Sequence, residues 1–240
     1  MTGVSVSEAA KRLGVGIQRV HQRIADGSLR AERIGSQWVV DELSLLRVAE
    51  NISPGRSLSA RSAWALVALA GGDRDALQEL SSTERARARS RLNHFFVWTT
   101  QPLSSEQQLG ELAAMLRGWF RNRAQRRLYR AAPADLPGLR EDERLALSGL
   151  SAAGGIAAGD IVEGYVGEDV AERLVKDHLL VAAENDANVV LHVVAPNRVA
   201  NVSSPLLLAA DLAEHRGPRE ELRAAELARE AASTYAESQR

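Results

Sequence analysis

The spacing of apolar side chains predicts two short helices at the start of the chain. Ala9, Ala10 and Leu13 recur at the spacing of one helix face. Either Ser5 or Ser7 can cap this first helix, because a hydroxyl can accept a hydrogen bond from a free backbone N–H. The glycines of Gly14-Val15-Gly16 then interrupt the pattern. A second helix is predicted beyond them, over residues 17–26.

The second predicted helix has one apolar and one polar side. Ile17, Val20 and Ile24 lie at i, i+3 and i+7, so we expect them to share the inward face. The polar side carries two pairs stacked at i, i+4: Gln18 with Gln22, and Arg19 with Arg23. After this helix, the β-forming run from Leu29 to Val40 is interrupted at Gly35-Ser36 and predicts a hairpin. Asp41 is expected to cap a third helix.

The remaining chain divides into a helical part and a mixed part. Residues 51–58 contain Pro54-Gly55 and form the best linker candidate. Helices are predicted over 59–70, after a capping box at Ser81 and Glu84, and after a second box at Ser104 and Gln107. The apolar stripe of the last of these extends as far as Leu128. Short strands are then predicted at 161–166, 179–181 and 189–194, before a final helix that begins near Pro218.

This pattern predicts a mainly α, multidomain protein. We expect a small domain of helices and a hairpin over 1–50, a basic helical segment over 51–132 and an acidic α/β domain over 133–240. Charge follows the same division: residues 1–130 carry 20 Lys and Arg against 12 Asp and Glu, whereas residues 131–240 carry 10 against 19. A basic half joined to an acidic half is compatible with a nucleic-acid-binding protein that has a separate partner-binding domain. It is equally compatible with two solvent-exposed surfaces of opposite charge that bind nothing.

Composition excludes several classes of protein. The 240-residue chain has no cysteine, so it has no disulfides, thiolate nucleophile or thiolate zinc site. It has no apolar run long enough to span a membrane, and its first residues lack the pattern of a secretory signal, so we expect a cytoplasmic protein without a membrane partner. The five histidines have no metal-ligand spacing, and no phosphate loop or nucleophile elbow is found. We therefore expect no catalytic residues, metal or cofactor.

The first fifty residues resemble a known DNA-binding module. Residues 6–15 read Val-Ser-Glu-Ala-Ala-Lys-Arg-Leu-Gly-Val, and the predicted second helix leads to Asp26-Gly27, Arg33 and the run Ile34-Gly35-Ser36-Gln37-Trp38. This combination resembles the excisionase-type and MerR-type winged helix-turn-helix family, over about a fifth of the chain. The resemblance implies a recognition helix at 17–26 and a hairpin wing.

The predicted DNA contacts follow from side-chain chemistry. Gln18, Arg19 and Gln22 can make bidentate contacts to base edges in the major groove. Phosphate contacts are expected from Lys11, Arg23 and Arg33, and wing-tip contacts from Ser36 and Gln37. His21 is left open between packing and contact, and Trp38 is expected to anchor the wing. Because one mildly basic domain neutralises few phosphates, we also expect a homodimer or a second basic surface.

An arginine cluster near residue 121 is one candidate for that second surface. Its members, expected at the end of the long helix, are Arg117, Arg121, Arg123, Arg126, Arg127 and Arg130. They can serve as auxiliary phosphate contacts, Arg121, Arg123, Arg126, Arg127 and Arg130 above all. Two alternatives stay open: pairing with the acidic domain of the same chain, and favourable placement of cations at a helix C-terminus.

Three fragments beyond residue 133 resemble the C-terminal domain of AbiEi-type antitoxins of type IV toxin–antitoxin systems. They are residues 146–153, residues 187–194 and residues 206–228. The resemblance implies an α/β domain that neutralises a nucleotidyltransferase-like toxin, in a chain that represses its own operon. We thus expect a sequence-specific transcriptional regulator with duplex DNA and a toxin-like protein as partners. The alternatives are a recombination directionality factor, and a protein-interaction or inhibitor module that no longer binds DNA.

Overall fold

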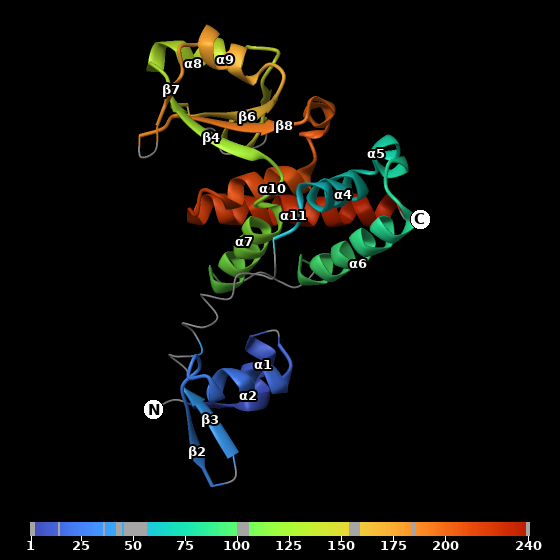
Figure 1. The fold of residues 1–240 in the computed structure, drawn as a ribbon, viewed down its shortest axis with the longest axis vertical. Coiled ribbons are helices and arrows are strands. Elements are labelled where there is room, and N and C mark those ends of the chain that lie inside the picture. Colours follow the sequence, from blue (N-terminus) through green and yellow to red (C-terminus); the bar gives the residue numbers. More distant parts are fainter. Residues whose placement is uncertain are drawn as a thin grey trace. The chain divides into compact units, whose positions relative to one another are not determined.

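The computed structural model describes residues 3–13, 15–35, 37–41, 45, 57–99, 106–153, 159–183 and 186–238. The chain forms two compact units, residues 1–55 and residues 56–240 (Figure 1). The first division lies close to the boundary expected after residue 50. The boundary expected after residue 132 does not separate two units, because the helices before it share a hydrophobic core with the last helices of the chain.

The described part of the N-terminal unit contains the helices α1 and α2 and a three-stranded antiparallel sheet with the strand order β1-β3-β2. Ser5 caps the first helix by accepting a hydrogen bond from the Glu8 N–H at 3.2 Å, as one of the two predicted caps. Ala9, Val20, Leu29 and Val40 are buried at the centre of this unit. The elements are β1 (Gly3–Ser5), α1 (Val6–Arg12), α2 (Ile17–Ala25), β2 (Ala31–Ile34) and β3 (Gln37–Asp41).

Two predictions in this unit need comment. Ile17 was expected on the inward face, but it is 52% exposed, because it stands at the first position of α2, where the helix has just begun. The helix expected after Asp41 lies mostly outside the described residues. Strand β1 was not predicted, since three residues are too few to show an alternating pattern; it pairs with β3 from Gly3↔Asp41 to Ser5↔Val39.

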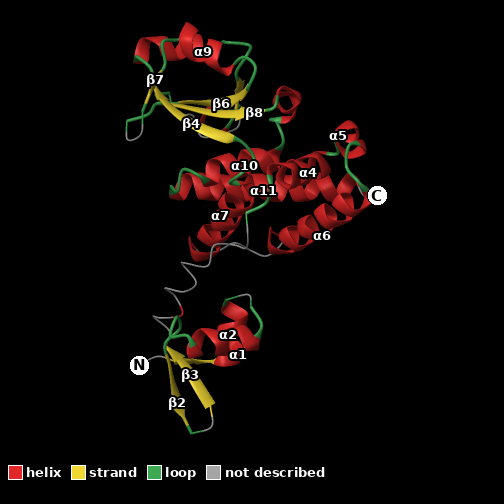
Figure 2. Cartoon of the chain, viewed as in Figure 1, coloured by secondary structure: helices red, strands yellow, loops and turns green. Residues whose placement is uncertain are grey.

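The second unit has a five-stranded sheet with the order β5-β6-β8-β4-β7 (Figure 2). Strands β6 and β8 are parallel and every residue of both is buried, whereas the other pairings are antiparallel. The strands are β4 (Gln125–Arg130), β5 (Ala146–Leu147), β6 (Val162–Gly167), β7 (Val181–Ala182) and β8 (Val189–Val194). The predicted strands near 161–166, 179–181 and 189–194 correspond to β6, β7 and β8.

Helices cover both faces of this sheet (Figure 1). Helices α8 and α9 pack on one face through Leu136, Leu139 and Leu174. The other face meets a larger helical layer, which includes the most apolar helices, α4 and α10. The helices of the unit are α4 (Ala60–Gly71), α5 (Arg74–Gln78), α6 (Ser82–Thr99), α7 (Glu106–Phe120), α8 (Leu136–Arg140), α9 (Ala171–Asp177), α10 (Pro205–Ala213) and α11 (Pro218–Ser238).

The capping box predicted before α6 is confirmed. The Glu84 carboxylate accepts from the Ser81 N–H at 2.8 Å, and the Ser81 hydroxyl accepts from the Glu84 N–H at 3.2 Å. Together with the Arg61 guanidinium, which donates to the same carboxylate, this lowers the pKa of Glu84 to about 2. The second predicted box, at Ser104 and Gln107, lies outside the residues whose side chains are described.

The long basic helix was predicted wrongly at its end. Helix α7 stops at Phe120, and residues 125–130 form strand β4 instead. In a helix, Arg123 would stack on Arg127, and Arg126 on Arg130, and like charges at i, i+4 are destabilising. As a strand, residues 125–129 instead satisfy the backbone of the buried strand β8, from Gln125↔Val193 to Tyr129↔Val189.

The architecture is therefore mixed α/β and largely helical, in line with the coarser part of the prediction. None of the helices within the described ranges is long and apolar enough to cross a membrane.

Candidate nucleic-acid interface

Helix α2 presents the side chains that were predicted to read bases. Gln18, Arg19 and Gln22 are all exposed, and a guanidinium N–H of Arg19 donates to Oε1 of Gln22 at 3.1 Å. Opposite them, Val20 is fully buried and anchors the helix in the core of its unit. The helix therefore offers a polar face with both donors and acceptors, held on a fixed scaffold.

The turn after α2 fixes how the helix leads into the hairpin. Asp26 accepts a hydrogen bond from the Ser28 N–H at 2.9 Å. Hydrogen bonds from the side chain and the backbone of Ser28 lower the pKa of Asp26. Gly27 has a φ of 75°, in the left-handed region that favours glycine. Leu29 then enters the core. The Asp-Gly pair in the sequence thus corresponds to a real turn between helix and hairpin.

The predicted phosphate contacts differ in how they are presented. Lys11, Arg33 and Gln37 are exposed, on α1, β2 and β3 respectively. Arg23 is half-buried, and its Nε has no hydrogen-bond partner within the part of the unit that is described. Ser36 lies outside the described residues. Gly35, beside it, has a φ of 63° at the tip of the hairpin.

Two residues near this surface had unsettled roles. His21 is exposed on α2, so it belongs to the polar face and does not pack in the core. Trp38 is half-buried on β3, opposite Arg33 in the β2–β3 pairing. Acidic groups dilute the positive charge: Glu8 forms an i, i+4 ion pair with Arg12 at 3.0 Å, and Glu32 is exposed on β2.

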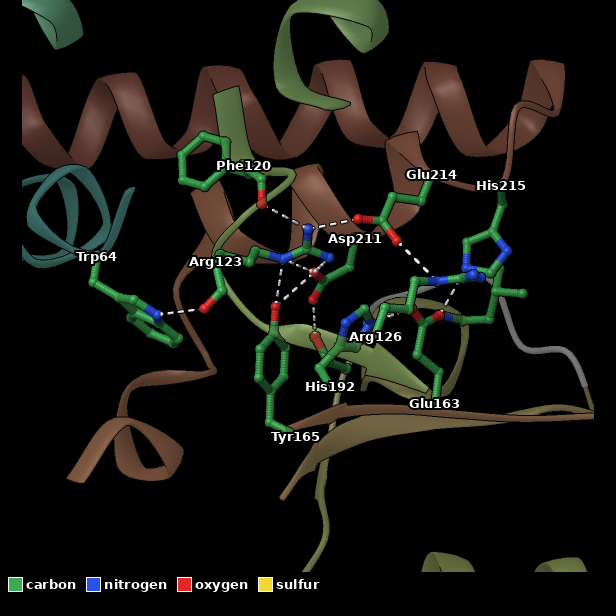
Figure 3. A network of polar contacts seen from close by, with 12 residues as sticks. Trp64, Phe120, Arg123, Arg126, Glu163, Tyr165, His192, Asp211, Glu214 and His215 are labelled. Atoms are coloured by element: carbon green, nitrogen blue, oxygen red, sulfur yellow. Dashed lines mark hydrogen bonds and ion pairs between the residues drawn. The ribbon is translucent and has the colours of Figure 1, made fainter. Parts of the chain in front are cut away.

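The arginine cluster that was expected to bind phosphates is largely used within the second unit (Figure 3). Arg123 is 3% exposed, which excludes it from DNA contact. Its guanidinium contacts Asp211 at 2.5 Å and Glu214 at 2.5 Å, and its Nε donates to the Tyr165 hydroxyl oxygen at 2.7 Å. It also donates to the Phe120 carbonyl at 3.1 Å, so a single buried side chain joins the end of α7 to β6 and α10.

The other arginines of the cluster lie at or near the surface. Arg126 pairs with Glu214 at 3.1 Å, and Arg130 pairs with Asp186. Arg127 donates to the Gln125 side chain at 2.9 Å, and Arg121 is exposed in the turn after α7. Arg117 likewise contacts Glu221 at 3.4 Å. For four of the six arginines, pairing with acidic residues beyond position 133, one of the open alternatives, is therefore the observed arrangement.

A second buried carboxylate lies beside the first network. Nε2 of His192 is 2.9 Å from Oε1 of Glu163, and Nε2 of His215 is 2.8 Å from Oε2. The Leu150 N–H donates to the same Oε2 at 3.0 Å. Gly149, at a φ of 54°, brings its backbone against this carboxylate, so close that a Cβ there would lie 2.0 Å from Oε2. Three groups therefore hydrogen-bond to the Glu163 carboxylate: the His192 ring, the His215 ring and the Leu150 N–H.

The protonation states follow from these contacts. Burial alone would raise the pKa of Glu163, but the hydrogen bonds from His192 and His215 outweigh it and lower the pKa to about 2. Burial disfavours the charged imidazolium of His215, yet the bond to Glu163 raises its pKa overall. Burial raises the pKa of Asp211, against the attraction of Arg123, and Ser148 hydrogen-bonds to its other oxygen.

The centre of this network is closed to solvent, whereas the side chains of Glu214 and His215 at its edge are 17% and 16% exposed. Ser148, Glu163 and Asp211 are fully buried, and Tyr165 is buried against them. Within the described ranges, no group of three or more His, Asp or Glu side chains is arranged to hold a metal ion. This network could not be predicted from the sequence, because its members are spread over residues 123–215 and form no local motif.

Comparison with known proteins gives no relative. No protein-family model matches the chain, and neither a curated protein nor a solved structure matches it.

Proposed function

We propose that the N-terminal unit is a winged helix-turn-helix and that the protein is a sequence-specific regulator of transcription that binds duplex DNA. The observation that carries the proposal is the exposed polar face of α2, with Gln18, Arg19 and Gln22. An α-helix with its side chains is about 10–12 Å across, so the nine-residue helix α2 fits a major groove about 12 Å wide. The hairpin β2–β3 is the wing.

The three side chains have distinct roles in this proposal. Arg19 is suited to the two acceptors of guanine, and Gln18 and Gln22 are suited to the donor and acceptor of adenine. Lys11 and Arg33 bind phosphates and fix the register of the helix without reading sequence. Gln37 lies beside the tip of the wing and contacts the backbone or the minor groove.

The regulator is further proposed to act as an antitoxin-like repressor of its own operon. The support is the resemblance of the C-terminal fragments to AbiEi-type antitoxins. Residues 146–153 and 187–194 contribute Ser148 and His192 to the buried networks, and residues 206–228 contribute Asp211 and His215. The resembling positions therefore lie mainly in the core, which supports a similar fold more than a particular toxin.

The test is binding of the purified full chain to its own upstream DNA and to a scrambled duplex, over a series of salt concentrations. Tight binding that prefers the native sequence and weakens with salt is expected of a regulator. Equal binding to both duplexes would argue against sequence-specific regulation. An absence of binding would favour the protein-interaction module, whereas preference for an integrase attachment site would favour a recombination directionality factor.

Arg19→Ala is expected to relax base preference at one or two positions of the preferred site, each by about 1–3 kcal/mol, because a bidentate contact to a base is lost. Binding to a library of single-base variants of the site measures this. Arg33→Ala is the matched comparison: it should weaken binding to all sequences equally and reduce the salt slope by about 1. An equal loss on every sequence for Arg19→Ala would make Arg19 a phosphate contact.

A further inference from the structure

Helix α6 of the second unit carries arginines that have no acidic partner among the described residues. Glu84 is the single Asp or Glu in this 18-residue helix, and it is already held by Ser81 and Arg61. Arg87, Arg89 and Arg91 follow it. Throughout the described part of the chain, no carboxylate lies within 4 Å of these three guanidinium groups; Glu79, in the turn after α5, approaches Arg198 instead.

Arg87 and Arg91 lie at one edge of the solvent side of α6 and Arg89 lies at its other edge, because residues two positions apart in a helix point in different directions. Arg87, Arg91 and His94 stand at i, i+4 and i+7, so they form one stripe about 10 Å long. Arg87, Arg89 and His94 are exposed and Arg91 is half-buried, with exposed Ser90 and Asn93 beside them. The opposite side of the helix, with Ala88, Leu92 and Phe95, is buried against the core, so the orientation of the stripe is fixed.

The arrangement is unfavourable for the isolated unit. Arg87 stacks on Arg91, and Arg85 on Arg89, at the i, i+4 spacing where like charges destabilise a helix. The helix dipole does not compensate, because the last turn of α6 has no basic residue. A bound polyanion would remove this repulsion.

We propose that this exposed side of α6, the α6 arginine face, is a second phosphate-binding surface for duplex DNA. This rests on the proposed DNA-binding function and supplies the second basic surface that one mildly basic domain needs. Arginine, serine and asparagine are among the side chains that bind DNA phosphates. The face contacts the backbone and so adds affinity without sequence preference.

DNA fits this face better than an acidic protein does. Protein interfaces are organised around a buried apolar or aromatic centre. The exposed residues of the α6 arginine face between residues 86 and 94 are Ala86, Arg87, Arg89, Ser90, Asn93 and His94, which include no large apolar side chain. Interfaces with DNA are more polar and more positively charged. Helix α6 packs on α4 and α11, on the side of these helices that faces away from the sheet, so an extended partner can reach it (Figure 1).

The test compares the wild-type full chain with the variant Arg87→Gln/Arg89→Gln/Arg91→Gln, on the native upstream duplex and a scrambled duplex across a salt series. Loss of three phosphate contacts should make the slope of log K against log salt shallower by about 2.7, and should weaken binding on the order of 100-fold at 0.1 M salt. The ratio of native to scrambled affinity should stay unchanged. Circular dichroism and thermal melting confirm that the variant is folded.

The matched control removes three cations elsewhere in the same unit. Arg173→Gln/Lys176→Gln/Arg219→Gln changes exposed side chains on α9 and α11 and gives the same change in net charge. A small effect here and a large one for the α6 variant support the α6 arginine face. If the two triple variants weaken DNA binding equally, or if the α6 variant binds as tightly as the wild type, the α6 arginine face does not bind DNA. Either result leaves the proposed function intact. If the wild type binds DNA in a salt-dependent way but without sequence preference, and only the α6 variant loses this binding, the result supports the α6 arginine face and contradicts the proposed sequence specificity. No binding by the wild type would refute both.

Discussion

Replacement of Arg123 by Met is expected to lower the free energy of unfolding of the second unit by about 3–5 kcal/mol. The guanidinium is the donor shared by Asp211, Glu214, Tyr165 and the Phe120 carbonyl. Without it, Asp211 is left as a fully buried carboxylate with no cation beside it, and its already raised pKa rises further. Urea unfolding of the full chain, followed by tryptophan fluorescence, measures the loss.

Arg121→Met provides the matched control for this prediction. Arg121 lies two residues before Arg123, carries the same charge and is exposed in the turn after α7. Its replacement should change the free energy of unfolding by no more than about 0.5 kcal/mol, as is usual for surface positions. If Arg123→Met were as stable as Arg121→Met, the buried ion pairs would contribute nothing to the fold.

Local patterns along the chain predicted most of the elements but not the buried networks. The Asp26-Gly27 turn, the Ser81–Glu84 capping box and the buried strand β8 each depend on neighbouring residues, so they can be predicted from the sequence. By contrast, Arg123 and Asp211 are separated by 88 positions and meet only in the folded unit. An arginine and an aspartate so far apart in the sequence do not by themselves predict that their side chains form an ion pair.

The same distinction explains why the role of the arginine cluster stayed open. The charges between residues 117 and 130 fit both phosphate contact and pairing within the chain, because a sequence shows charge but not exposure. In the structure, Arg123 is buried, Arg126 and Arg130 are paired, and residues 125–130 are a strand. The run from Arg85 to Arg91 in α6 has fewer arginines, yet three of them have no acidic partner among the residues that the structure describes. Pairing, more than the number of cations, decides which surface can bind a polyanion.

Replacement of Glu163 by Gln is expected to destabilise the second unit in a way that depends on pH. The pKa of Glu163 is lowered from 4.5 to about 2, so its ionised form contributes about 3 kcal/mol of stability. This contribution is complete above pH 4.5 and is lost as the pH falls through 2. The difference in unfolding free energy between the wild type and Glu163→Gln should therefore shrink as the solution is acidified from pH 5 to pH 3.

His215→Gln should show the opposite dependence, because the pKa of His215 is raised from 6.5 by the same contact. Its stabilising effect is complete below pH 6.5 and is lost as the pH rises through the raised value. Urea unfolding of the wild type and both variants at pH 3 to 9 separates the two contributions, which are complete together only between pH 4.5 and 6.5. If the difference in unfolding free energy between the wild type and either variant stayed constant from pH 3 to pH 9, the carboxylate and the imidazole would not be coupled. The Glu163–His215 contact would then give stability by packing alone, and the buried network would have no response to pH.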